Sequence, residues 1–263
     1  MIYSIIEPTA PKVPILISSP HSGTDFPEEI KQQLLPEAVN NPDDTDWFID
    51  TLYNFASDMG ITIIKANYNR WVIDLNRDPN SKPLYNDGRV ITGLVPETDF
   101  NGNPLYSDKT PDEQEIKRRI EHYYKPYHKK VGELLQELKD TFGYAILFDA
   151  HSIRRMVPGI RKTPFPQLIL GDNDETSAAP QIIKAALDAI TQSNYEATHN
   201  HPFKGGYITR YFGKPEENIH ALQLEMAKTN YMNASETAFS EENAAEIRIV
   251  LKQLFTNLIA TKL

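Results

Sequence analysis

The sequence predicts a single α/β domain with a mixed, mostly parallel sheet flanked by helices. Short apolar runs of strand length alternate with longer stretches of helical periodicity, which is the pattern of strand–helix–strand units. The 263 residues and the 40% hydrophobic fraction are enough for one complete core. We find no internal repeat or low-complexity linker, so we expect residues 1–263 to form one domain.

The first half of the chain alternates strands with a helix and ends in a long loop. We expect a buried strand over 13–19, because this apolar run stops at Pro, His, Ser and Gly. Apolar residues at helical spacing predict a helix over 44–59. Further strands are expected over 61–64 and 71–75. A loop with short strands should follow over 78–110, which is rich in Pro, Asn, Asp and Gly.

The second half starts with a helix signal at Thr110-Pro111, a cap followed by proline in the first turn. This helix is expected to continue to about residue 140, with an interruption near Pro126. The remaining expected elements are strands over 144–148, 167–171, 195–199 and 221–226, helices over 178–192 and 240–262, and a loop opened by Gly205 and Gly206. This alternation favours parallel neighbours in the sheet.

Composition and charge exclude several classes of function. The formal net charge is -9, and an acidic surface repels phosphate backbones, so we expect no nucleic-acid partner. The chain has no cysteine, so a bound metal would need histidine and carboxylate ligands. The apolar run near the N-terminus is too short to cross a bilayer, so we expect a cytoplasmic protein with no membrane partner. The oligomeric state is left open.

Reactive side chains follow or lie in several of the expected strands. His21 follows the first strand, Asn76 and Arg77 follow the third, His151 follows the central strand, and Glu225 lies in a late one. In open α/β sheets, sites form beyond the carboxyl ends of the strands. We therefore expect these residues to share one site.

His21 and His151 are the candidate metal ligands. Two histidines and one carboxylate are a usual set for catalytic zinc, with one position left for water. The carboxylate is expected at the acidic start of the helix over 44–59, where Asp46 is favoured over Asp44 and helix capping is the alternative role. Asp149 shares a face with His151 and is interpreted either as the carboxylate that orients it or as an ordinary loop acid.

Glu225 is the candidate general base. A carboxylate inside an apolar run is costly unless it is paired, and burial brings its pKa toward working pH. The alternative is a salt-bridged glutamate on an edge strand. Arg77 ends a strand and Arg210 follows two glycines, so both are expected to hold an anionic ligand. The other expected substrate contacts are Arg70, Asn76 and Ser22.

Together these motifs resemble the N-formylglutamate amidohydrolases. The matching segments are Ser19-Pro20-His21-Ser22-Gly23, Asp44-Thr45-Asp46-Trp47, Val72-Ile73-Asp74-Leu75-Asn76-Arg77, Phe148-Asp149-Ala150-His151-Ser152, Pro202-Phe203-Lys204-Gly205-Gly206-Tyr207-Ile208-Thr209-Arg210 and His220-Ala221-Leu222-Gln223-Leu224-Glu225-Met226. They run in order over about residues 15–232. The resemblance implies a fold distantly similar to zinc carboxypeptidases and aspartoacylases, the phosphorylase/hydrolase-like fold.

The resemblance also implies roles for the residues. His21, Asp46 and His151 would bind one zinc ion, or another divalent metal in its place. Glu225 would be the base of a metal-assisted hydrolysis, and Arg77 would polarise the carbonyl or hold a carboxylate. The substrate would be a small anionic N-acyl amino acid, with N-formyl-L-glutamate of histidine degradation as the first expectation.

Two questions stay open at this point. The distant relatives place the first histidine and the acid three residues apart, whereas Thr24 stands there in this chain and Asp25 follows it. The metal carboxylate is therefore open among Asp46, Asp44 and Asp25. The alternative functions are a zinc amidase or carboxypeptidase-like hydrolase acting on another N-acyl amino acid or peptide, and a non-catalytic binding protein, which ranks low because every candidate residue is present.

Overall fold

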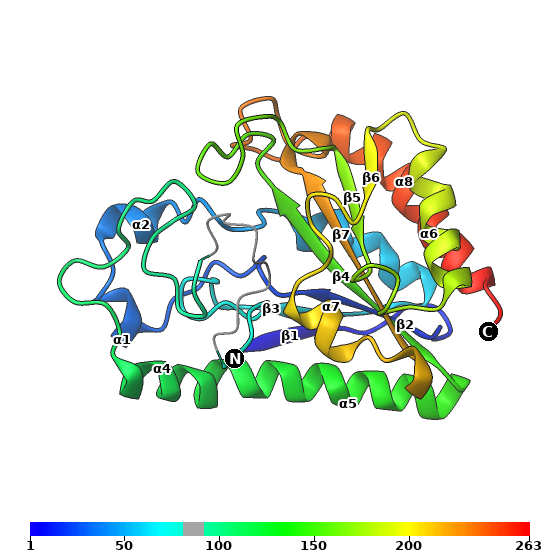
Figure 1. Ribbon diagram of the computed structural model, residues 1–263, viewed down its shortest axis with the longest axis horizontal. Helices are drawn as coiled ribbons and strands as arrows, with labels where there is room; N and C mark the ends of the chain where they lie inside the picture. Colours follow the sequence, from blue (N-terminus) through cyan, green and yellow to red (C-terminus); the bar gives the residue numbers. More distant parts are fainter. Residues whose placement is uncertain (81–91) are drawn as a thin grey trace.

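A seven-stranded twisted sheet runs through the computed structural model, which describes residues 1–80 and 92–263 (Figure 1). The strands, in their order across the sheet, are β1 (Tyr3–Ile6), β3 (Thr62–Ala66), β2 (Ile15–Ser19), β4 (Ala145–Ile153), β7 (Ile219–Ala227), β5 (Leu168–Gly171) and β6 (Ala197–His199). Neighbours pair in parallel except β1 with β3 and β5 with β7. The predicted fold class, a mixed and mostly parallel sheet flanked by helices, is confirmed.

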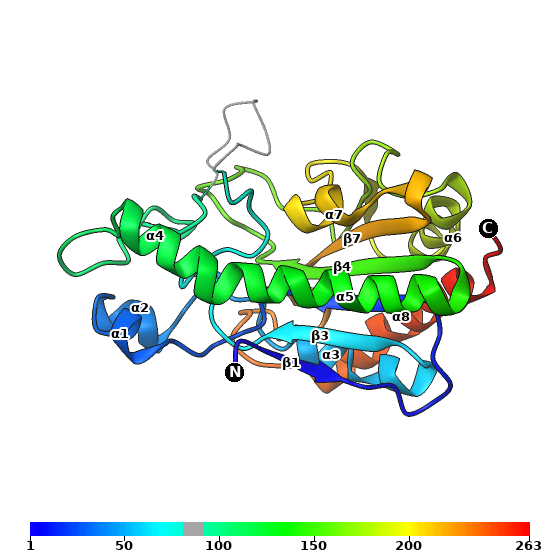
Figure 2. The ribbon, with the colours of Figure 1, turned by 90° about the horizontal axis from the view of Figure 1, so that it is seen from below.

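Helices cover both faces of the sheet (Figure 2). The longer ones are α4 (Glu113–Arg119), α5 (Lys125–Phe142), α6 (Pro180–Thr191) and α8 (Glu241–Ala260), and the shorter ones are α1 (Glu28–Lys31), α2 (Pro36–Asn40), α3 (Ile49–Leu52) and α7 (Tyr207–Phe212). In β2, Ile15 and Ile17 pack into the core shared with α6 and α8, whereas Leu16 packs into the core shared with α5. The alternation of side chains along each strand therefore builds two cores, one on each face.

The helix predicted from Thr110 is interrupted where the sequence indicates. A π-helical turn over Ile120–Tyr124 separates α4 from α5, directly before Pro126. Proline has no backbone N–H and its ring clashes with the preceding turn, so it disrupts the regular α-helical ladder. Among the described residues, no helix has both the length and the apolar character needed to cross a bilayer.

The helix predicted over 44–59 is only partly correct. Residues 44–48 form turns, α3 begins at Ile49, and a 3-10 helix follows over Asn54–Met59. Phe48 has a φ of 63°, which ends any helix running through it, and the amide of Asp46 donates to the carbonyl of His21 at 2.9 Å. Contacts with distant residues thus replace the first turns of the predicted helix. The hydrogen bond of Asp46 holds residues 44–48 next to the end of β2.

The strand predicted over 71–75 is wrong. This segment is buried but consists of turns, because side chains capture its backbone amides. Asn69 accepts from the amide of Trp71 at 3.0 Å, and Asp74 accepts from the amide of Asn76 at 2.9 Å. Such local bonds compete with ladder pairing.

Other differences concern elements that the sequence signals only weakly. The structure adds β1, an antiparallel edge strand, and α7, which starts directly after Gly206. Both β4 and β7 are longer than predicted, so Asp149 and His151 lie within β4. The loop predicted over 78–110 contains only isolated bridges in its described part, and residues 81–91 lie outside the described residues.

Glu115 on α4 gives a pH-dependent contribution to stability. It forms ion pairs with Arg118 at 2.7 Å and with the fully buried Arg119 at 2.8 Å. The hydrogen bond from Arg118, aided by Arg119, lowers its pKa to about 2. We expect Glu115→Gln to lower the free energy of unfolding by about 1–3 kcal/mol at pH 7, because a buried guanidinium loses its carboxylate.

The depressed pKa fixes the sign of this effect. The contribution is complete above about pH 4.5, the unfolded value, and is lost as the pH falls toward 2. Urea denaturation at pH 7 and at pH 3 measures it, with the exposed Glu113→Gln as control, which should change stability by under about 0.5 kcal/mol. An effect of Glu115→Gln that does not shrink at low pH contradicts the assignment.

Candidate active site

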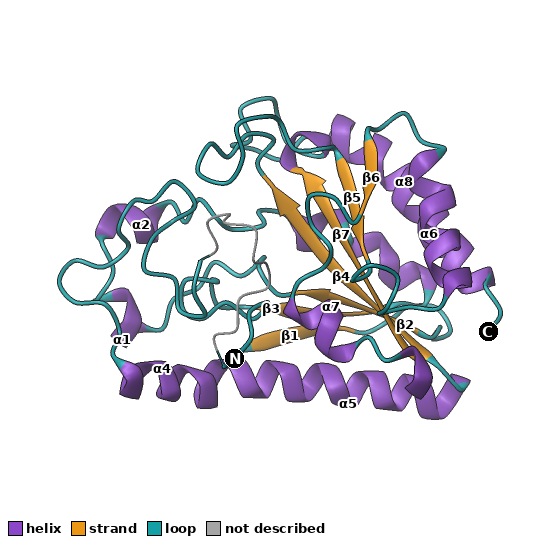
Figure 3. Ribbon diagram, in the orientation of Figure 1, coloured by secondary structure: helices purple, strands orange, loops and turns teal. Residues whose placement is uncertain are grey.

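Three of the residues singled out in the sequence meet at the carboxyl end of the sheet. β4 and β7 run side by side to this edge (Figure 3). His21 follows β2, His151 lies near the end of β4, and Asp46 lies in the turn before α3. All three are at most 3% exposed, and one potential ligand atom from each lies within 4.8 Å of the others.

Each histidine presents Nδ1 to the same carboxylate oxygen. Asp46 Oδ2 lies 3.1 Å from His151 Nδ1 and 3.9 Å from His21 Nδ1. The opposite ring nitrogens are held by other carboxylates: His21 Nε2 donates to Asp74 at 2.7 Å, and His151 Nε2 donates to Asp149 at 2.9 Å. In the neutral form of each ring, a proton held on Nε2 leaves Nδ1 with a free lone pair. Two nitrogens and one oxygen that converge in this way fit a divalent metal.

The other two candidate carboxylates do not reach the histidines. Asp44 is buried, but it accepts from Trp71 Nε1 at 3.0 Å and from the amide of Phe100 at 3.1 Å. Asp25 is exposed and forms a backbone bridge with Tyr68. Within the described part of the chain, the histidines and Asp46 form the one cluster with metal-ligand geometry. Neither Asp44 nor Asp46 caps α3, whose N-cap is Phe48.

Buried charges give this cluster a strong attraction for a cation. Burial alone lowers the pKa of His151, but Asp149 and Asp46 outweigh it and raise the pKa well above its usual value. Burial raises the pKa of Asp74, yet Arg70 and Arg77 reverse the effect and hold it well below the ordinary range. The pKa of His21 is lowered to about 4 by burial and by Arg70. His21 is therefore neutral at pH 7.

Glu225 stands beside the cluster on β7, in register with His151 of β4. β7 lies between β4 and β5, so Glu225 is not on an edge strand. Among the described residues its carboxylate has no ion-pair or hydrogen-bond partner, which removes the salt-bridged alternative. Burial, opposed by His151 and reinforced by Asp46, raises its pKa to about 8. A carboxyl group in this condition is suited to accept a proton near neutral pH.

The arginine that reaches the cluster is Arg70. Arg70 is 6% exposed, donates to Asp74 at 2.5 Å and stacks on the ring of Phe100 at 4.8 Å. Its charge acts on His21, Asp46 and Glu225. Arg77, in contrast, turns its guanidinium toward Thr92 at 3.0 Å and lies 3.6 Å from Asp74.

The other expected contact residues lie around this centre. Asn76 is buried behind His151: its amide nitrogen lies 3.0 Å from His151 Nε2 and donates to Asp149, while its oxygen accepts from the amide of Ile208 at 2.8 Å. Ser22 accepts from Ser19 at 2.9 Å. Arg210 Nε donates to the carbonyl of Gly205 at 2.9 Å. Their roles toward a substrate stay predictions.

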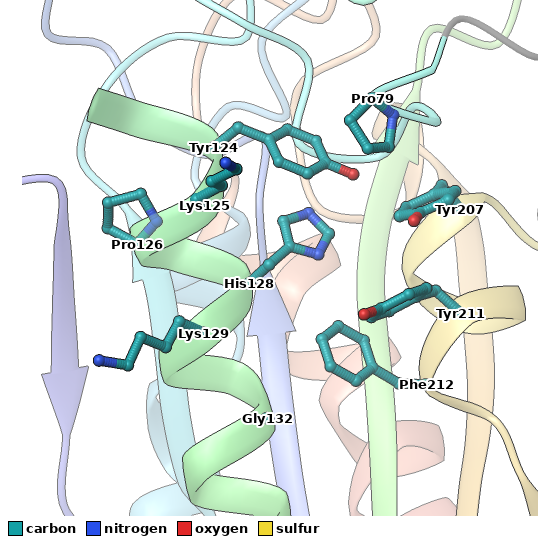
Figure 4. A pocket seen from close by; sticks show the side chains of 10 residues that line it. All are labelled: Pro79, Tyr124, Lys125, Pro126, His128, Lys129, Gly132, Tyr207, Tyr211 and Phe212. Carbon is teal, nitrogen blue, oxygen red and sulfur yellow. The ribbon is translucent and has the colours of Figure 1, made fainter. Parts of the chain in front are cut away.

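An aromatic groove between α5 and α7 supports the segment that carries Asn76 and Arg77. The groove has a volume of about 770 Å³ (Figure 4). His128, stacked on Tyr124 with ring centroids 4.1 Å apart, donates from Nε2 to the carbonyl of Leu75 at 2.8 Å. Tyr124 donates to the carbonyl of Arg77 at 2.8 Å. The groove walls therefore fix the backbone on both sides of Asn76.

Sequence reasoning missed three buried polar residues of the site: Asp74, Gln223 and Lys228. Gln223 accepts from the amide of Gly206 at 2.7 Å. Asp74 carried a signal, because Arg70 lies four residues before it and a buried acid needs a cation. Lys228 also carried one, since it follows Glu225 by three residues, directly after the end of the same strand.

Gly206 allows a close backbone approach to Asn76. A Cβ at this position would lie 2.2 Å from Asn76 Nδ2. We expect Gly206→Ala to lower the free energy of unfolding by about 1–3 kcal/mol, because Asn76 must leave its partners. Gly132→Ala in α5, where the nearest atom lies at 3.7 Å, is the control and should be neutral or stabilising. Equal thermal stability of the two variants contradicts the role given to Gly206.

Comparisons with known proteins agree on one family. Residues 13–232 match the sequence model described as N-formylglutamate amidohydrolase. Two curated N-formylglutamate deformylases are similar: that of Pseudomonas putida is 40% identical, covering 95% of this chain and 93% of its own, and that of Pseudomonas aeruginosa is 41% identical, covering 95% and 94%. The crystal structure of N-formylglutamate amidohydrolase from Ralstonia eutropha has a TM-score of 0.80 at 25% identity and covers 97% of both chains. A protein from Agrobacterium tumefaciens, with a TM-score of 0.75 at 18% identity over 98% of this chain and 94% of its own, shares the fold.

Proposed function

Since the chain belongs to the N-formylglutamate amidohydrolase family, we propose that it hydrolyses N-formyl-L-glutamate to glutamate and formate with the help of one divalent metal, zinc above all. The observation that carries the proposal is the meeting of His21, Asp46 and His151 beside the carboxylate of Glu225, which has no ion-pair or hydrogen-bond partner among the described residues. The curated relatives are named for this activity and align over nearly the whole chain.

The metal would be held by His21 Nδ1, His151 Nδ1 and Asp46 Oδ2. A divalent ion supplies Lewis-acid activation of an amide carbonyl and of water. Asp74 and Asp149 hold the two Nε2 atoms, which keeps both rings turned toward Asp46. The chain therefore orients its proposed ligands through a second layer of buried carboxylates.

Glu225 is the proposed base. Its carboxylate takes a proton from the attacking water and returns it to the nitrogen of the leaving amine as the C–N bond breaks. We assign the role of stabilising the developing negative charge on the carbonyl oxygen to Arg70. The reason is that its charge acts on Glu225 and on Asp46, whereas Arg77 is directed toward Thr92.

Arg77 and Arg210 remain the proposed contacts for the substrate carboxylates. The position in histidine degradation and the cytoplasmic location stay predictions. The second candidate function, hydrolysis of another N-acyl amino acid by the same chemistry, rests on the same residues.

A formate-release assay tests the proposed function. We expect the purified protein to release formate from N-formyl-L-glutamate, to lose at least about 100-fold of its activity after dialysis against a chelator, and to recover when zinc is added. A panel of N-acyl amino acids separates the two candidate functions. Undiminished hydrolysis by protein shown to be metal-free would refute the metal mechanism, and hydrolysis of other N-acyl amino acids only would favour the second candidate.

A further inference from the structure

A buried tyrosine joins the chain segments that carry two of the proposed metal ligands. Tyr231 is fully buried and lies in the turn that follows β7. Its hydroxyl oxygen lies 2.9 Å from the carbonyl oxygen of Trp47 and 2.7 Å from Oγ of Ser152. Trp47 directly follows Asp46, and Ser152 directly follows His151. One hydroxyl group therefore connects the chain neighbours of Asp46 and His151.

The two contacts use both hydrogen-bonding capacities of the phenol. A phenol has one proton to donate and a carbonyl oxygen can only accept, so Tyr231 donates to Trp47 and accepts from the hydroxyl of Ser152. Burial raises the pKa of Tyr231 well above its ordinary value, and the nearby carboxylates of Asp46 and Glu225 reinforce the shift. The hydroxyl is therefore a neutral group enclosed in protein, placed close to the site without facing solvent.

These bonds extend the one that already holds the turn of Asp46. The amide of Asp46 donates to the carbonyl of His21 at 2.9 Å, and the next residue, Trp47, accepts from Tyr231. A series of hydrogen bonds thus runs from His21 through the turn of Asp46 and through Tyr231 to the end of β4, where His151 lies. The relative positions of the three proposed ligands therefore depend on this series.

A second buried tyrosine of the same core lacks such bonds. Tyr53 directly follows α3, is 1% exposed and packs in the same apolar cluster as Tyr231. Among the described residues, its hydroxyl has no hydrogen-bond partner. Comparison of the two residues therefore separates the effect of the hydrogen bonds from the effect of a buried phenol ring.

We propose that Tyr231 is a positioning residue that sets the spacing of His21, Asp46 and His151 for the divalent metal. The inference rests on the proposed function and adds a residue that touches neither metal nor substrate. Outer partners of metal ligands typically contribute about 10- to 100-fold to metal affinity, because they fix the directions of the ligand atoms. Without its hydroxyl, the turn of Asp46 loses its tie to β4, so the metal affinity should fall.

Tyr231→Phe removes the hydroxyl and keeps the ring. We expect the zinc dissociation constant of metal-stripped protein, measured by competition with a chromophoric chelator, to rise about 10- to 100-fold. Ser152→Ala should also raise it, but in the Tyr231→Phe background it should add less than about twofold, because its partner is already gone. Tyr53→Phe is the matched control and should keep the wild-type constant.

Two further measurements distinguish positioning from a general loss of stability. Glu115→Gln is expected to be destabilised at a place on α4, so its zinc dissociation constant should equal that of the wild type. With zinc saturating, Tyr231→Phe should lower kcat about tenfold and change KM for N-formyl-L-glutamate by less than about threefold. The reason is that the proposed substrate contacts, Arg77 and Arg210, do not belong to the series of hydrogen bonds.

The inference is overturned if folded Tyr231→Phe keeps the wild-type dissociation constant, if Tyr53→Phe or Glu115→Gln weakens zinc binding as much, or if KM rises while kcat is unchanged. Thermal unfolding shows whether Tyr231→Phe is folded, and Ser152→Ala replaces it under the same criteria if it is not. A wild-type protein that binds no zinc overturns the metal mechanism and this inference with it. A wild-type protein that binds zinc but releases no formate overturns the proposed substrate alone, and the zinc titrations then decide the inference.

Discussion

Asp46→Asn is expected to abolish binding of the proposed metal and with it nearly all activity, whereas Asp44→Asn should keep both. Asp46 is the carboxylate that lies 3.1 Å from Nδ1 of His151 and 3.9 Å from Nδ1 of His21. Asparagine keeps the shape but loses the charge, and a neutral amide oxygen is a poor ligand beside two imidazoles. Loss of an outer carboxylate typically weakens metal binding about 10- to 100-fold, so loss of a direct ligand should exceed that range.

Asp44→Asn is a closely matched control, because Asp44 and Asp46 are two residues apart in one turn and both are buried. Asp44 binds Trp71 and Phe100, so its replacement should affect stability more than metal content. Metal analysis of the purified variants, together with titration of zinc into stripped protein, measures the difference. Equal loss of metal in the two variants, or retention of metal by Asp46→Asn, contradicts the assignment of Asp46.

The features predicted correctly from the sequence have local causes. The buried strands β2, β4 and β7 are apolar runs that end at polar residues, and their parallel pairing brings His21, His151 and Glu225 to one edge. Amphipathic periodicity likewise places α5, α6 and α8 within a few residues of their predicted bounds. Patterns with a period of two or of 3.6 residues therefore suffice for these elements.

The features that were wrong or undecided depend on contacts between distant segments. The apolar segment 71–75 was predicted to be a strand. It forms turns, because Asn69 accepts from the amide of Trp71 and Asp74 accepts from the amide of Asn76. The choice of Asp46 over Asp44 and Asp25 depends on a hydrogen bond between the turn at Asp46 and the carbonyl of His21. No periodicity encodes such contacts, so the sequence could favour Asp46 as the metal carboxylate but could not exclude Asp44 and Asp25.

The proposed roles of the two arginines depend on contacts of the same kind. Arg77 ends a conspicuous motif and was the first choice for the carbonyl, while Arg70 was counted only as a substrate contact. In the folded chain Asp74 lies within reach of both arginines and of His21, and it holds Arg70 by the shorter ion pair. Asp74 thereby fixes one histidine and one arginine of the site together. The spacing of Arg70 and Asp74 indicates their ion pair, but the bond between Asp74 and the distant His21 has no signature in sequence spacing.

Glu225→Gln is expected to lower kcat by about 100- to 10,000-fold while leaving the metal in place. Glutamine keeps the size of the side chain but cannot accept the proton of the attacking water. Glu225 is outside the cluster of potential metal ligands, so metal content should equal that of the wild type. Single-turnover measurements of formate release test the loss of activity, and metal analysis tests the metal content. Glu236→Gln, in the loop after β7, is the control and should match the wild type in both measurements.

The pKa of Glu225 gives this prediction a second, independent readout. Burial raises it to about 8 in the metal-free chain, so the carboxyl group binds a proton more tightly when folded than when unfolded. Its contribution to stability is therefore complete below about pH 4.5 and is lost as the pH rises through 8. Glutamine stays neutral, so metal-free Glu225→Gln protein should lose less stability than the wild type between pH 6 and pH 9. A bound divalent cation favours the carboxylate and lowers this pKa, which is what a base at neutral pH requires. Wild-type kcat in the variant, or identical stability profiles without metal, would remove Glu225 from the mechanism.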